Sequence, residues 1–368
     1  MARGFVRKAF YLALILLGVS LLCFALLHLS GRDPALAIAL RAQNVSEENL
    51  ARINEVLRKV NYRPNLIARS LASGRQYTLA VVMPRFAQGE YWADFDAGIV
   101  RAEAEARRYN ISVRKFFFDQ YDRASFEKLL AELRNEAFDG AVIATLFAEM
   151  VTPFARELDE RGIPYVFVDS NIPECNQLAY FGTSSFDAGV VAARLLSDRL
   201  DPGSDIVVGN IIHRGDGGSN QCRSREEGFR SYLREKGFRG KLHYAALRLD
   251  DEGYNREVLD ELFLRHPAIA GAVTFNSTCY ILAGYLAARR RTDVRLVGYD
   301  VIRRNGQMLG AGVVTALIAQ RPEAQGYRGV MALCEWLVER RRPETTVNHM
   351  PIDILLKENI QYYKNNLI

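Results

Sequence analysis

Cysteine and histidine are scarce in this sequence, and neither forms a recognisable redox or metal-binding motif. The five cysteines are scattered without a C-x-x-C pair, and the five histidines show no metal-ligand spacing. Closely spaced, paired cysteines mark a disulfide framework, and short His or Cys spacings mark zinc sites. The sequence therefore predicts reduced cysteines packed in the core, no metal site and no cofactor.

Recognised catalytic motifs are also missing. The sequence contains no G-x-S-x-G nucleophile elbow, no H-E-x-x-H zinc motif, no Walker A loop and no G-x-G-x-x-G turn after a strand. Each of these patterns places a nucleophile, a metal or a phosphate cradle where the chemistry needs it. We therefore predict no catalytic residues and expect that the protein is not an enzyme.

A strong charge of either sign is missing as well. The 368 residues include 48 basic and 43 acidic side chains, a net charge of +5. A small basic surplus permits nucleic acid or anionic lipid as a partner but requires neither. The length exceeds that of a usual single domain, so a body with two lobes is expected.

One long apolar run is present near the amino terminus. Residues 9–29 carry no formal charge, and Arg3, Arg7 and Lys8 precede them. A bilayer needs about 20 apolar residues, and leading basic residues keep that end in the cytoplasm. We expect a single-pass anchor in the inner membrane with the body outside the cytoplasm. A cleaved signal peptide, or a buried helix of a cytoplasmic protein, remains an alternative.

The same run has a resemblance of its own. The stretch LLGVSLLCFALLHLSGRDPALAIAL, residues 16–40, resembles the first membrane helix of dipeptide- or nickel-type ABC-transporter permeases. Arg32 interrupts the turn that follows the helix in those proteins. The similarity covers only about residues 1–40, and no further apolar span follows. We therefore interpret residues 1–42 as a membrane-anchor-like segment and not as part of a permease.

A helical pattern follows at residues 43–76. Leu50, Ile53 and Leu57 recur at helical spacing, and Pro64 interrupts the pattern. The stretch VSEENLARINEVLRKVNYRPNLIARSLASG resembles the third headpiece helix and the hinge helix of the LacI/GalR family of sugar-responsive repressors. In that family the hinge helix enters the minor groove of DNA. The residues that match the hinge pattern are Tyr62, Pro64, Asn65, Ala68 and Leu71.

The base-reading part of such a headpiece is not recognisable. A helix-turn-helix needs two short helices with polar and basic side chains aimed at DNA. Residues 30–44 offer only Arg32 and Arg41, and the apolar run lies before them. We therefore interpret residues 43–76 as a remnant of a headpiece. The chain is expected to bind DNA weakly or not at all.

From Tyr77 onward, short apolar runs alternate with amphipathic segments, which predicts an α/β fold with parallel sheets. This part resembles the periplasmic-binding-protein-like sensor core of the same family, so that the whole resemblance spans about residues 45–363. It implies the type I fold, with two doubly wound parallel-sheet lobes around a ligand cleft, preceded here by the apolar helix. The predicted lobes are residues 77–174 with 321–347, and residues 175–320 with 348–363.

Four ligand-binding residues follow from this resemblance. SNQCRSREEGF matches the pattern S-x-x-x-R-x-x-G-(F/W), and the sugar-binding arginine falls on Arg223. AVTFNSTCYILAG places the ligand asparagine at Asn276, although Ser277 stands where the family has aspartate. LVGYD ends in Asp300, and the crossover pattern T-x-x-x-Q places Gln320 near the cleft.

The other lobe offers candidates by position alone. Ligands of open parallel sheets bind beyond the carboxyl ends of the strands, so polar and aromatic residues after the first four strands are candidates. Thr145 and Asn171 stand at such positions too, but strand-end residues of this kind also cap helices. The candidates in this lobe are Tyr91, Trp92, Asp119, Phe147 and Asp169.

Three kinds of function remain. The first is a LacI-type regulator without its base-reading helices that binds a small carbohydrate, polyol or sugar acid. The second is a membrane-anchored solute-binding or sensory protein that faces the periplasm. The third is a chain joined from two unrelated parts, active only as a sugar binder. Whether two chains form a homodimer, and which sugar binds, are left open.

Overall fold

The structure, a computed structural model, describes residues 75–212 and 219–363. The apolar run at 9–29, the headpiece remnant and all five hinge residues lie outside these ranges, so the predictions made for them remain predictions. Within the described ranges, no helix has both the length and the apolar character that crossing a bilayer requires.

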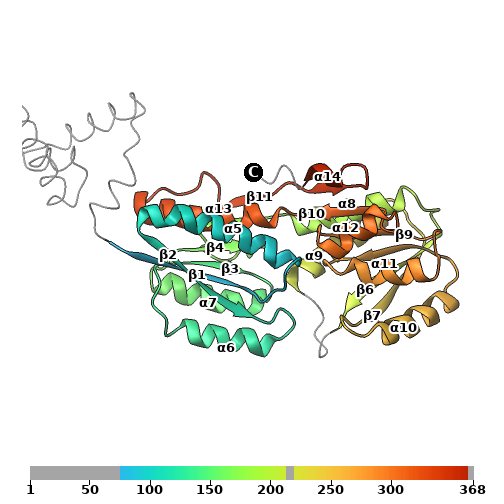
Figure 1. The fold of residues 1–368 in the computed structure, drawn as a ribbon, viewed down its shortest axis with the longest axis horizontal. Helices are drawn as coiled ribbons and strands as arrows, with labels where there is room; N and C mark the ends of the chain where they lie inside the picture. The colour runs from blue at the N-terminus through green and yellow to red at the C-terminus, as the bar shows by residue number, and fades with distance from the viewer. Residues whose placement is uncertain (1–74, 213–218, 364–368) are drawn as a thin grey trace, which may run out of the picture.

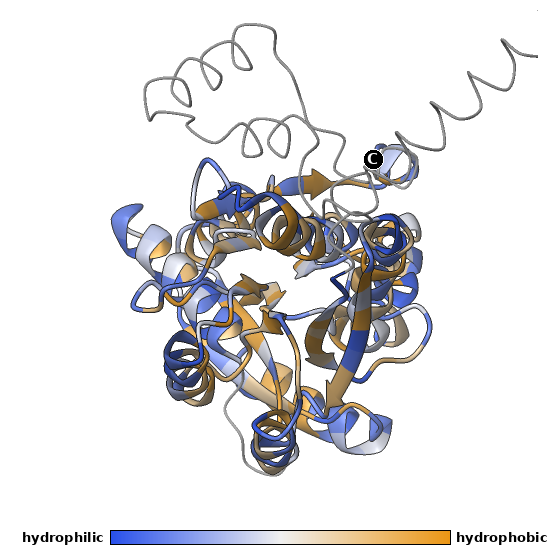
Figure 2. Cartoon of the chain, turned by 90° about the vertical axis from the view of Figure 1, so that its left-hand side faces the viewer, coloured by the Kyte–Doolittle hydropathy of each residue, from blue (hydrophilic) through white to orange (hydrophobic). Residues whose placement is uncertain are grey.

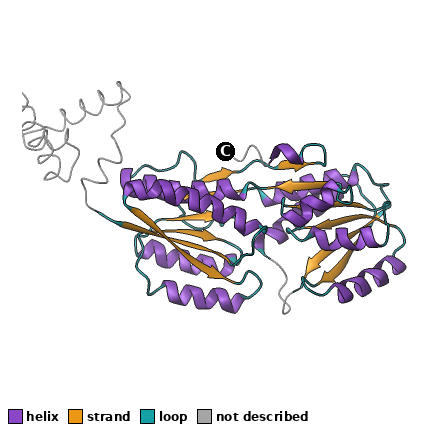
Figure 3. Cartoon of the chain, viewed as in Figure 1, coloured by secondary structure: helices purple, strands orange, loops and turns teal. Residues whose placement is uncertain are grey.

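Two lobes lie side by side, each built on a sheet between helices (Figures 1 and 3). Each sheet has six strands. Neighbouring strands are parallel except for β10 and β12, so the predicted doubly wound parallel architecture is confirmed. The first sheet has the order β11 (Val347–His349), β5 (Ala179–Gly182), β4 (Tyr165–Val168), β3 (Gly140–Ala144), β1 (Tyr77–Pro84), β2 (Ile111–Phe118). The second has the order β12 (Asp353–Leu355), β10 (Ala316–Ala319), β9 (Arg295–Tyr299), β8 (Ile269–Thr274), β6 (Asp205–Ile211), β7 (Leu242–Leu247).

Helices cover both faces of the sheets, and their apolar sides pack on the strands (Figure 2). In the first lobe, α5 and α13 lie on one face and α6 and α7 on the other (Figure 1). The first-lobe helices are α5 (Tyr91–Ala106), the 3-10 helix η1 (Arg107–Tyr109), α6 (Arg123–Leu133), α7 (Ala148–Glu160) and α13 (Pro322–Glu339). The second-lobe helices are α8 (Ser185–Ser197), α9 (Asn220–Glu235), α10 (Glu252–Arg265), α11 (Cys279–Ala288), α12 (Arg303–Gly310) and α14 (Ile360–Tyr363).

The chain passes between the lobes three times. The first passage follows β5, because β5 pairs with β4 and β11 in the first sheet. The boundary predicted between residues 174 and 175 was therefore wrong, and Gly182 ends the first-lobe segment. The second passage lies between Ala319 and Pro322, at the predicted place. The third follows His349, two residues after the predicted boundary, since β11 belongs to the first sheet and β12 to the second.

Helix α9 is held close against α8 by glycine. A Cβ atom added to Gly189 would lie 1.9 Å from the backbone oxygen of Arg225, and one added to Gly228 would lie 2.0 Å from that of Phe186. Neither position can accept a side chain without a shift of backbone. The side chain of Ser219 caps the start of α9 by accepting a hydrogen bond from the Cys222 N–H. These contacts fix the helix whose first turn contacts the other lobe, since the Asn220 N–H donates to the Leu146 carbonyl at 3.2 Å.

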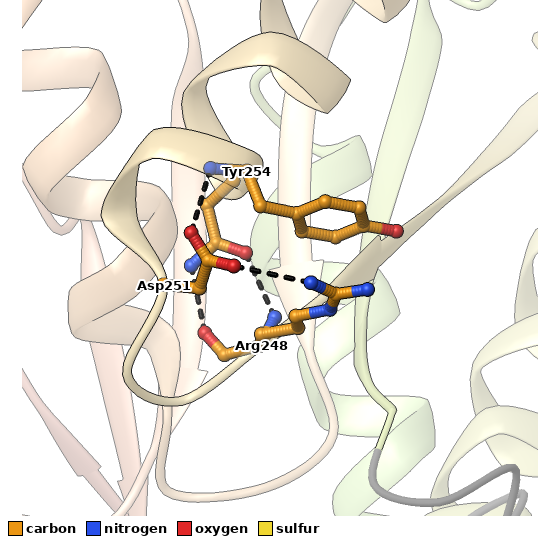
Figure 4. Close-up of polar contacts among 4 residues, drawn as sticks. Arg248, Asp251 and Tyr254 are labelled. Carbon is orange, nitrogen blue, oxygen red and sulfur yellow. Dashed lines mark hydrogen bonds and ion pairs between the residues drawn. The ribbon is translucent and has the colours of Figure 1, made fainter.

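The turn between β7 and α10 is closed by its own side chains (Figure 4). The Asp251 carboxylate accepts the Tyr254 N–H at 3.0 Å and the Arg248 guanidinium at 3.1 Å. The guanidinium also lies 3.9 Å from the centre of the Tyr254 ring. Asn255 bonds both backbone groups of Arg248 at 2.7 Å. The turn therefore holds the start of α10 firmly on the end of β7.

Candidate functional site

A cavity lies between the two lobes, beyond the carboxyl ends of the strands, where ligands of open α/β sheets bind. Its volume is about 100 Å³. One water needs about 10–15 Å³, so the cavity can hold several waters or a small polar ligand. The first lobe contributes Tyr91, Trp92, Gln120, Tyr121, Leu146, Phe147 and Asp169, and the second contributes Ile211, Ser219, Gln221, Cys222, Asn276, Ser277, Asp300 and Gln320.

The second lobe forms a polar wall in which three predicted residues meet. Asn276, Asp300 and Gln320 follow the adjacent strands β8, β9 and β10, and all three line the cavity. Asp300 adopts a left-handed backbone with φ of 65°, a conformation that is uncommon outside glycine. The Asn276 side-chain carbonyl accepts the Thr278 N–H at 3.1 Å and its hydroxyl at 2.5 Å. The side-chain oxygen of Asn276 is thus occupied by Thr278, and its amide N–H groups are left for other partners.

A chain of side-chain hydrogen bonds joins the lobes at the cavity. The side-chain amide of Gln221 donates to the Asp169 carboxylate at 2.6 Å and to the side-chain carbonyl of Gln320 at 3.0 Å. The Gln320 amide in turn donates to the Asp300 carboxylate at 2.7 Å. Asp169 belongs to the first lobe and the other three residues belong to the second. All four are buried, so this amide–carboxylate chain is a direct polar link across the cleft.

The two aspartates of this chain are hard to ionise. The pKa of Asp169 is raised to about 7, mainly by burial and also by the Asp300 charge, against the opposing effects of Arg225 and of the hydrogen bond from Gln221. Burial likewise raises the pKa of Asp300 to about 6, again opposed by Arg225. A group that donates hydrogen bonds to an ionised carboxylate favours that form. A ligand with hydroxyl donors would therefore stabilise the charged state of both residues.

Arg225 supplies the positive charge behind the polar wall. Its side chain is fully buried, donates to the Phe275 carbonyl at 2.7 Å and stacks 4.1 Å from the centre of the Tyr299 ring. Its Nε and Nη2 atoms are buried and have no hydrogen-bond partner among the described residues. A buried guanidinium with open donors is costly unless charge or acceptors lie near. Asp169 and Asp300 provide that charge.

The structure brings Arg225 to the polar wall of the cavity, and not Arg223, the arginine predicted from the sequence. Arg223 is exposed and does not line the cavity. The spacing from Ser219 points to Arg223, whereas the spacing R-x-x-G-F from Gly228 points to Arg225. The buried residues of α9 follow helical spacing, since Gln221, Arg225, Gly228 and Phe229 share one face. That periodicity was available in the sequence and selects Arg225.

The first lobe forms an aromatic wall. Tyr91 and Trp92 open α5, and their rings meet edge to face with centres 5.0 Å apart. Trp92 donates its indole N–H to Gln120 at 3.3 Å. Phe147, just before α7, also lines the cavity. The Tyr91 hydroxyl is buried without a hydrogen-bond partner among the described residues, and burial raises its pKa well above its usual value. It is therefore a neutral group available to a ligand.

Three polar candidates of the first lobe have other roles. Asp119 does not line the cavity, so the structure does not bring it together with the other predicted ligand-binding residues. Its carboxylate accepts the Tyr121 N–H at 2.9 Å and thus shapes the turn after β2. The buried Thr145 hydroxyl donates to the carbonyls of the β4 end, at 3.0 Å for Val168. Asn171 accepts the side-chain amide of Gln177 at 3.0 Å.

Several lining residues were not predicted. Gln120 and Tyr121 directly follow Asp119, so the strand-end position was right and the residue was not. Gln221 lies four residues before Arg225 on the same face of α9, which a correct helical register would have shown. For the small and apolar members no sequence signal stands out. The unpredicted residues are Gln120, Tyr121, Leu146, Ile211, Ser219, Gln221, Cys222 and Ser277.

Comparison with known proteins gives the same fold and a consistent set of relatives. The family described as periplasmic binding protein domain matches residues 79–339. The HTH-type transcriptional regulator AglR of Rhizobium meliloti (strain 1021) is 28% identical over 266 residues, 70% of each chain. The ribose operon repressor of Halalkalibacterium halodurans is 26% identical over 278 residues, which are 74% of this chain and 76% of the repressor.

Solved structures show the likeness in three dimensions. A Bacteroides fragilis protein described as a LacI transcriptional regulator is 39% identical, with a TM-score of 0.73, and the match covers 78% of this chain and all of that one. The glucose-galactose binding protein GanP of Geobacillus stearothermophilus is 18% identical with a TM-score of 0.65, covering 78% of this chain and 99% of that one. At that identity GanP shows the shared fold alone.

Proposed function

Because the chain belongs to the periplasmic binding protein domain family, we propose that it is a LacI-type sugar sensor that binds a small neutral carbohydrate or polyol between its lobes. The domain is related both to LacI-type regulators and to sugar-binding proteins. The observation that carries the proposal is the pairing of an aromatic wall with an amide–carboxylate wall around one cavity. Sugar rings present apolar faces and hydroxyl edges, and these walls suit both.

The charges of the cavity favour a neutral ligand over a sugar acid. Asp169 and Asp300 line the cavity, and the described lining residues include no arginine, lysine or histidine. The Arg225 guanidinium lies behind them, where its charge already opposes the raised pKa of both aspartates. A ligand carboxylate would bring a third negative charge into a buried site, which is unfavourable. Hydroxyl groups, in contrast, can donate to both aspartates.

Ligand binding is expected to act on the link between the lobes. In the present arrangement the side-chain nitrogen of Gln221 donates to the Asp169 carboxylate and to the side-chain oxygen of Gln320. Hydroxyl groups of a ligand would compete for these same acceptors and connect the two lobes through the ligand. A ligand that binds one arrangement of the lobes more tightly shifts the population toward it. The signal of the sensor is therefore the relative position of the lobes.

A panel of ligands measured by thermal unfolding tests this function. Neutral pentoses, hexoses and polyols are compared with the corresponding sugar acids. A ligand at 100 times its Kd stabilises the folded state by about 2.7 kcal/mol, which raises the melting temperature by several degrees. We expect at least one neutral compound to do so and the matched acid to do less. Stabilisation by acids alone would contradict the assignment of a neutral ligand.

We assign the protein no catalytic reaction and at most weak binding to DNA. The headpiece pattern at residues 43–76 contains the hinge residues but no recognisable base-reading helices. Phosphate contacts alone give dissociation constants of roughly 10⁻⁴–10⁻⁶ M at physiological salt. The measurement is a DNA gel shift with the full chain and with a version that carries a family-type helix-turn-helix ahead of Asn44. Nanomolar, sequence-specific binding by the unmodified chain would contradict the proposal.

A second role, as a membrane-anchored binding protein facing the periplasm, is favoured by one feature. Residues 9–29 are free of charge and follow Arg3, Arg7 and Lys8, which suits a span with its leading end in the cytoplasm. The test is fractionation of cells that express the full chain or a version starting at Val45. Recovery of the full chain with the membranes would support the anchor, and equal recovery of both in the soluble fraction would refute it.

A further inference from the structure

Three metal-ligand side chains meet at the end of the second lobe that lies away from the cavity. Asp205 begins β6, His243 is near the start of β7, and His266 lies on the loop between α10 and β8. These three strands are neighbours in the sheet, in the order β8-β6-β7. Their amino ends therefore lie together, whereas the cavity lies beyond their carboxyl ends. The sequence gives no hint of this, because the three residues are far apart along the chain.

The three side chains already contact each other. One potential ligand atom from each lies within 4.8 Å of the other two. The His243 Nε2 atom is 2.7 Å from an Asp205 carboxylate oxygen, and the His243 and His266 rings stack with centres 3.7 Å apart. The other Asp205 oxygen accepts the Lys241 N–H at 2.8 Å. This bond orients the carboxylate toward the histidines, and all three residues remain partly exposed.

We propose that Asp205, His243 and His266 bind a divalent transition-metal ion of the zinc type, with water at the remaining position. Imidazole nitrogen and carboxylate oxygen are ligands of zinc at about 2.0–2.2 Å, and two imidazoles with one carboxylate suit zinc, nickel and copper better than calcium or magnesium. The site is independent of the cavity and of the proposed function, so each can fail without the other.

The geometry needs one local adjustment. A metal bonds in the plane of an imidazole ring, so two rings stacked face to face cannot both point at one ion. His266 is the ring that rotates, because it lies on a partly exposed loop, whereas the Asp205 hydrogen bond and the β7 backbone hold His243. Tetrahedral ligands at zinc distances lie about 3.4 Å apart. The three atoms, already within 4.8 Å, therefore have little distance to close.

Metal binding would tie down the edge of the second sheet. β7 pairs with β6 and has no further neighbour among the described strands, so it is the edge strand. Its carboxyl end is held by the Arg248–Asp251 turn described above (Figure 4). The metal would fix its amino end to β6 and to the loop that follows α10. Because a metal that binds only the folded state stabilises it, the full chain should unfold at a higher temperature in its presence.

Calorimetric titration of the full chain with Zn²⁺ alone, after treatment with a chelator, tests the site. We expect one saturable site per chain, weakened at least about tenfold in both His243→Gln and His266→Gln, since even outer-shell changes cost about 10–100-fold in metal affinity. His349→Gln is the matched control, because His349 lies in β11 of the other lobe. Its affinity for zinc should equal that of the unmodified chain.

Two results would overturn the proposal. One is the absence of saturable zinc binding with a Kd tighter than about 1 mM. The other is unchanged affinity in both histidine variants, which would assign the metal to another group such as a cysteine. Melting curves without metal establish that the variants fold. The His266→Gln variant keeps the proposal testable if His243→Gln does not fold, because His266 contributes no strand pairing.

Discussion

The two lobes share one architecture but give the cavity opposite kinds of wall. The first lobe presents mainly rings, from Tyr91, Trp92, Tyr121 and Phe147. The second presents mainly amides, hydroxyls and a carboxylate, including Gln221, Asn276, Asp300 and Gln320. The residues of both sets lie just after strand ends or at the first turns of helices, so the same positions of the fold support different chemistry. The difference shows that neither lobe alone forms the site, since a sugar offers an apolar face and polar edges.

The largest expected effect comes from the charge behind the polar wall. Arg225→Met leaves Asp169 and Asp300 without the nearby positive charge that offsets theirs, and an uncompensated buried charge costs about 3–5 kcal/mol. Chemical denaturation should show this loss in the free energy of unfolding. Arg328→Met, at an exposed arginine of α13, is the control and should change it by no more than about 0.5 kcal/mol. An equal loss in both variants would contradict the compensating role of Arg225.

The next effect is a dependence of stability on pH. In the unfolded chain the pKa of Asp169 is near its ordinary value of 3.8, and in the folded chain it is about 7. Its contribution to stability is therefore fully present below about pH 4 and is lost as the pH rises to about 7. We expect a loss on the order of a few kcal/mol over this range, without ligand. Asp169→Asn should flatten that part of the curve, and an equal slope in both proteins would contradict the raised pKa.

The link between the lobes gives a smaller effect. Gln221→Leu removes the donor that serves Asp169 and Gln320, and an unpaired buried acceptor costs about 1–3 kcal/mol. The free energy of unfolding should fall by that amount, while scattering in solution should show lobes that lie further apart. The exposed Gln307→Leu serves as control. Unchanged stability and shape would show that the amide–carboxylate chain does not hold the lobes together.

The aromatic wall gives the smallest of these effects. Trp92→Phe keeps an aromatic ring and loses ring area and the indole N–H bond to Gln120. Aromatic pairs contribute about 0.5–1.5 kcal/mol, so ligand affinity should fall by roughly two- to tenfold. Trp336→Phe on α13, away from the cavity, should leave it unchanged. A loss larger than that of the polar-wall variants would reverse the ranking of the two lobes.

In each lobe, all but one of the residues predicted to bind the ligand line the cavity, for a physical reason. Asn276, Asp300 and Gln320 each follow a buried strand. The carboxyl ends of parallel strands meet at one edge of the sheet, so residues that follow them lie close together. Asp119 stands at such a place too, but its carboxylate turns back to the Tyr121 N–H. Backbone hydrogen bonds compete with a ligand for strand-end carboxylates. The sequence alone does not reveal whether such a carboxylate bonds to the backbone or to a ligand.

Other parts depended on contacts that lie far apart along the chain. The pairing of β5 with β4 decided the first lobe boundary. The raised pKa of Asp169 comes mainly from its burial, and the charges of Arg225 and Asp300 in the other lobe have smaller, opposing effects on it. The choice between Arg223 and Arg225 was different, because helical periodicity on α9 already favours Arg225. Long-range packing thus explains the lobe boundary and the burial of Asp169, whereas a wrong helical register explains the choice of Arg223.

Calorimetric titration of the unmodified chain and of Asp300→Asn with the most stabilising neutral sugar tests the central claim most directly. Asp300 lines the cavity and ends the amide–carboxylate chain. A hydrogen bond to a charged group contributes about 1.5–3 kcal/mol, so the account predicts an affinity lower by roughly 10- to 150-fold in the variant. Equal affinity of the two proteins would show that the sugar does not bind between the lobes.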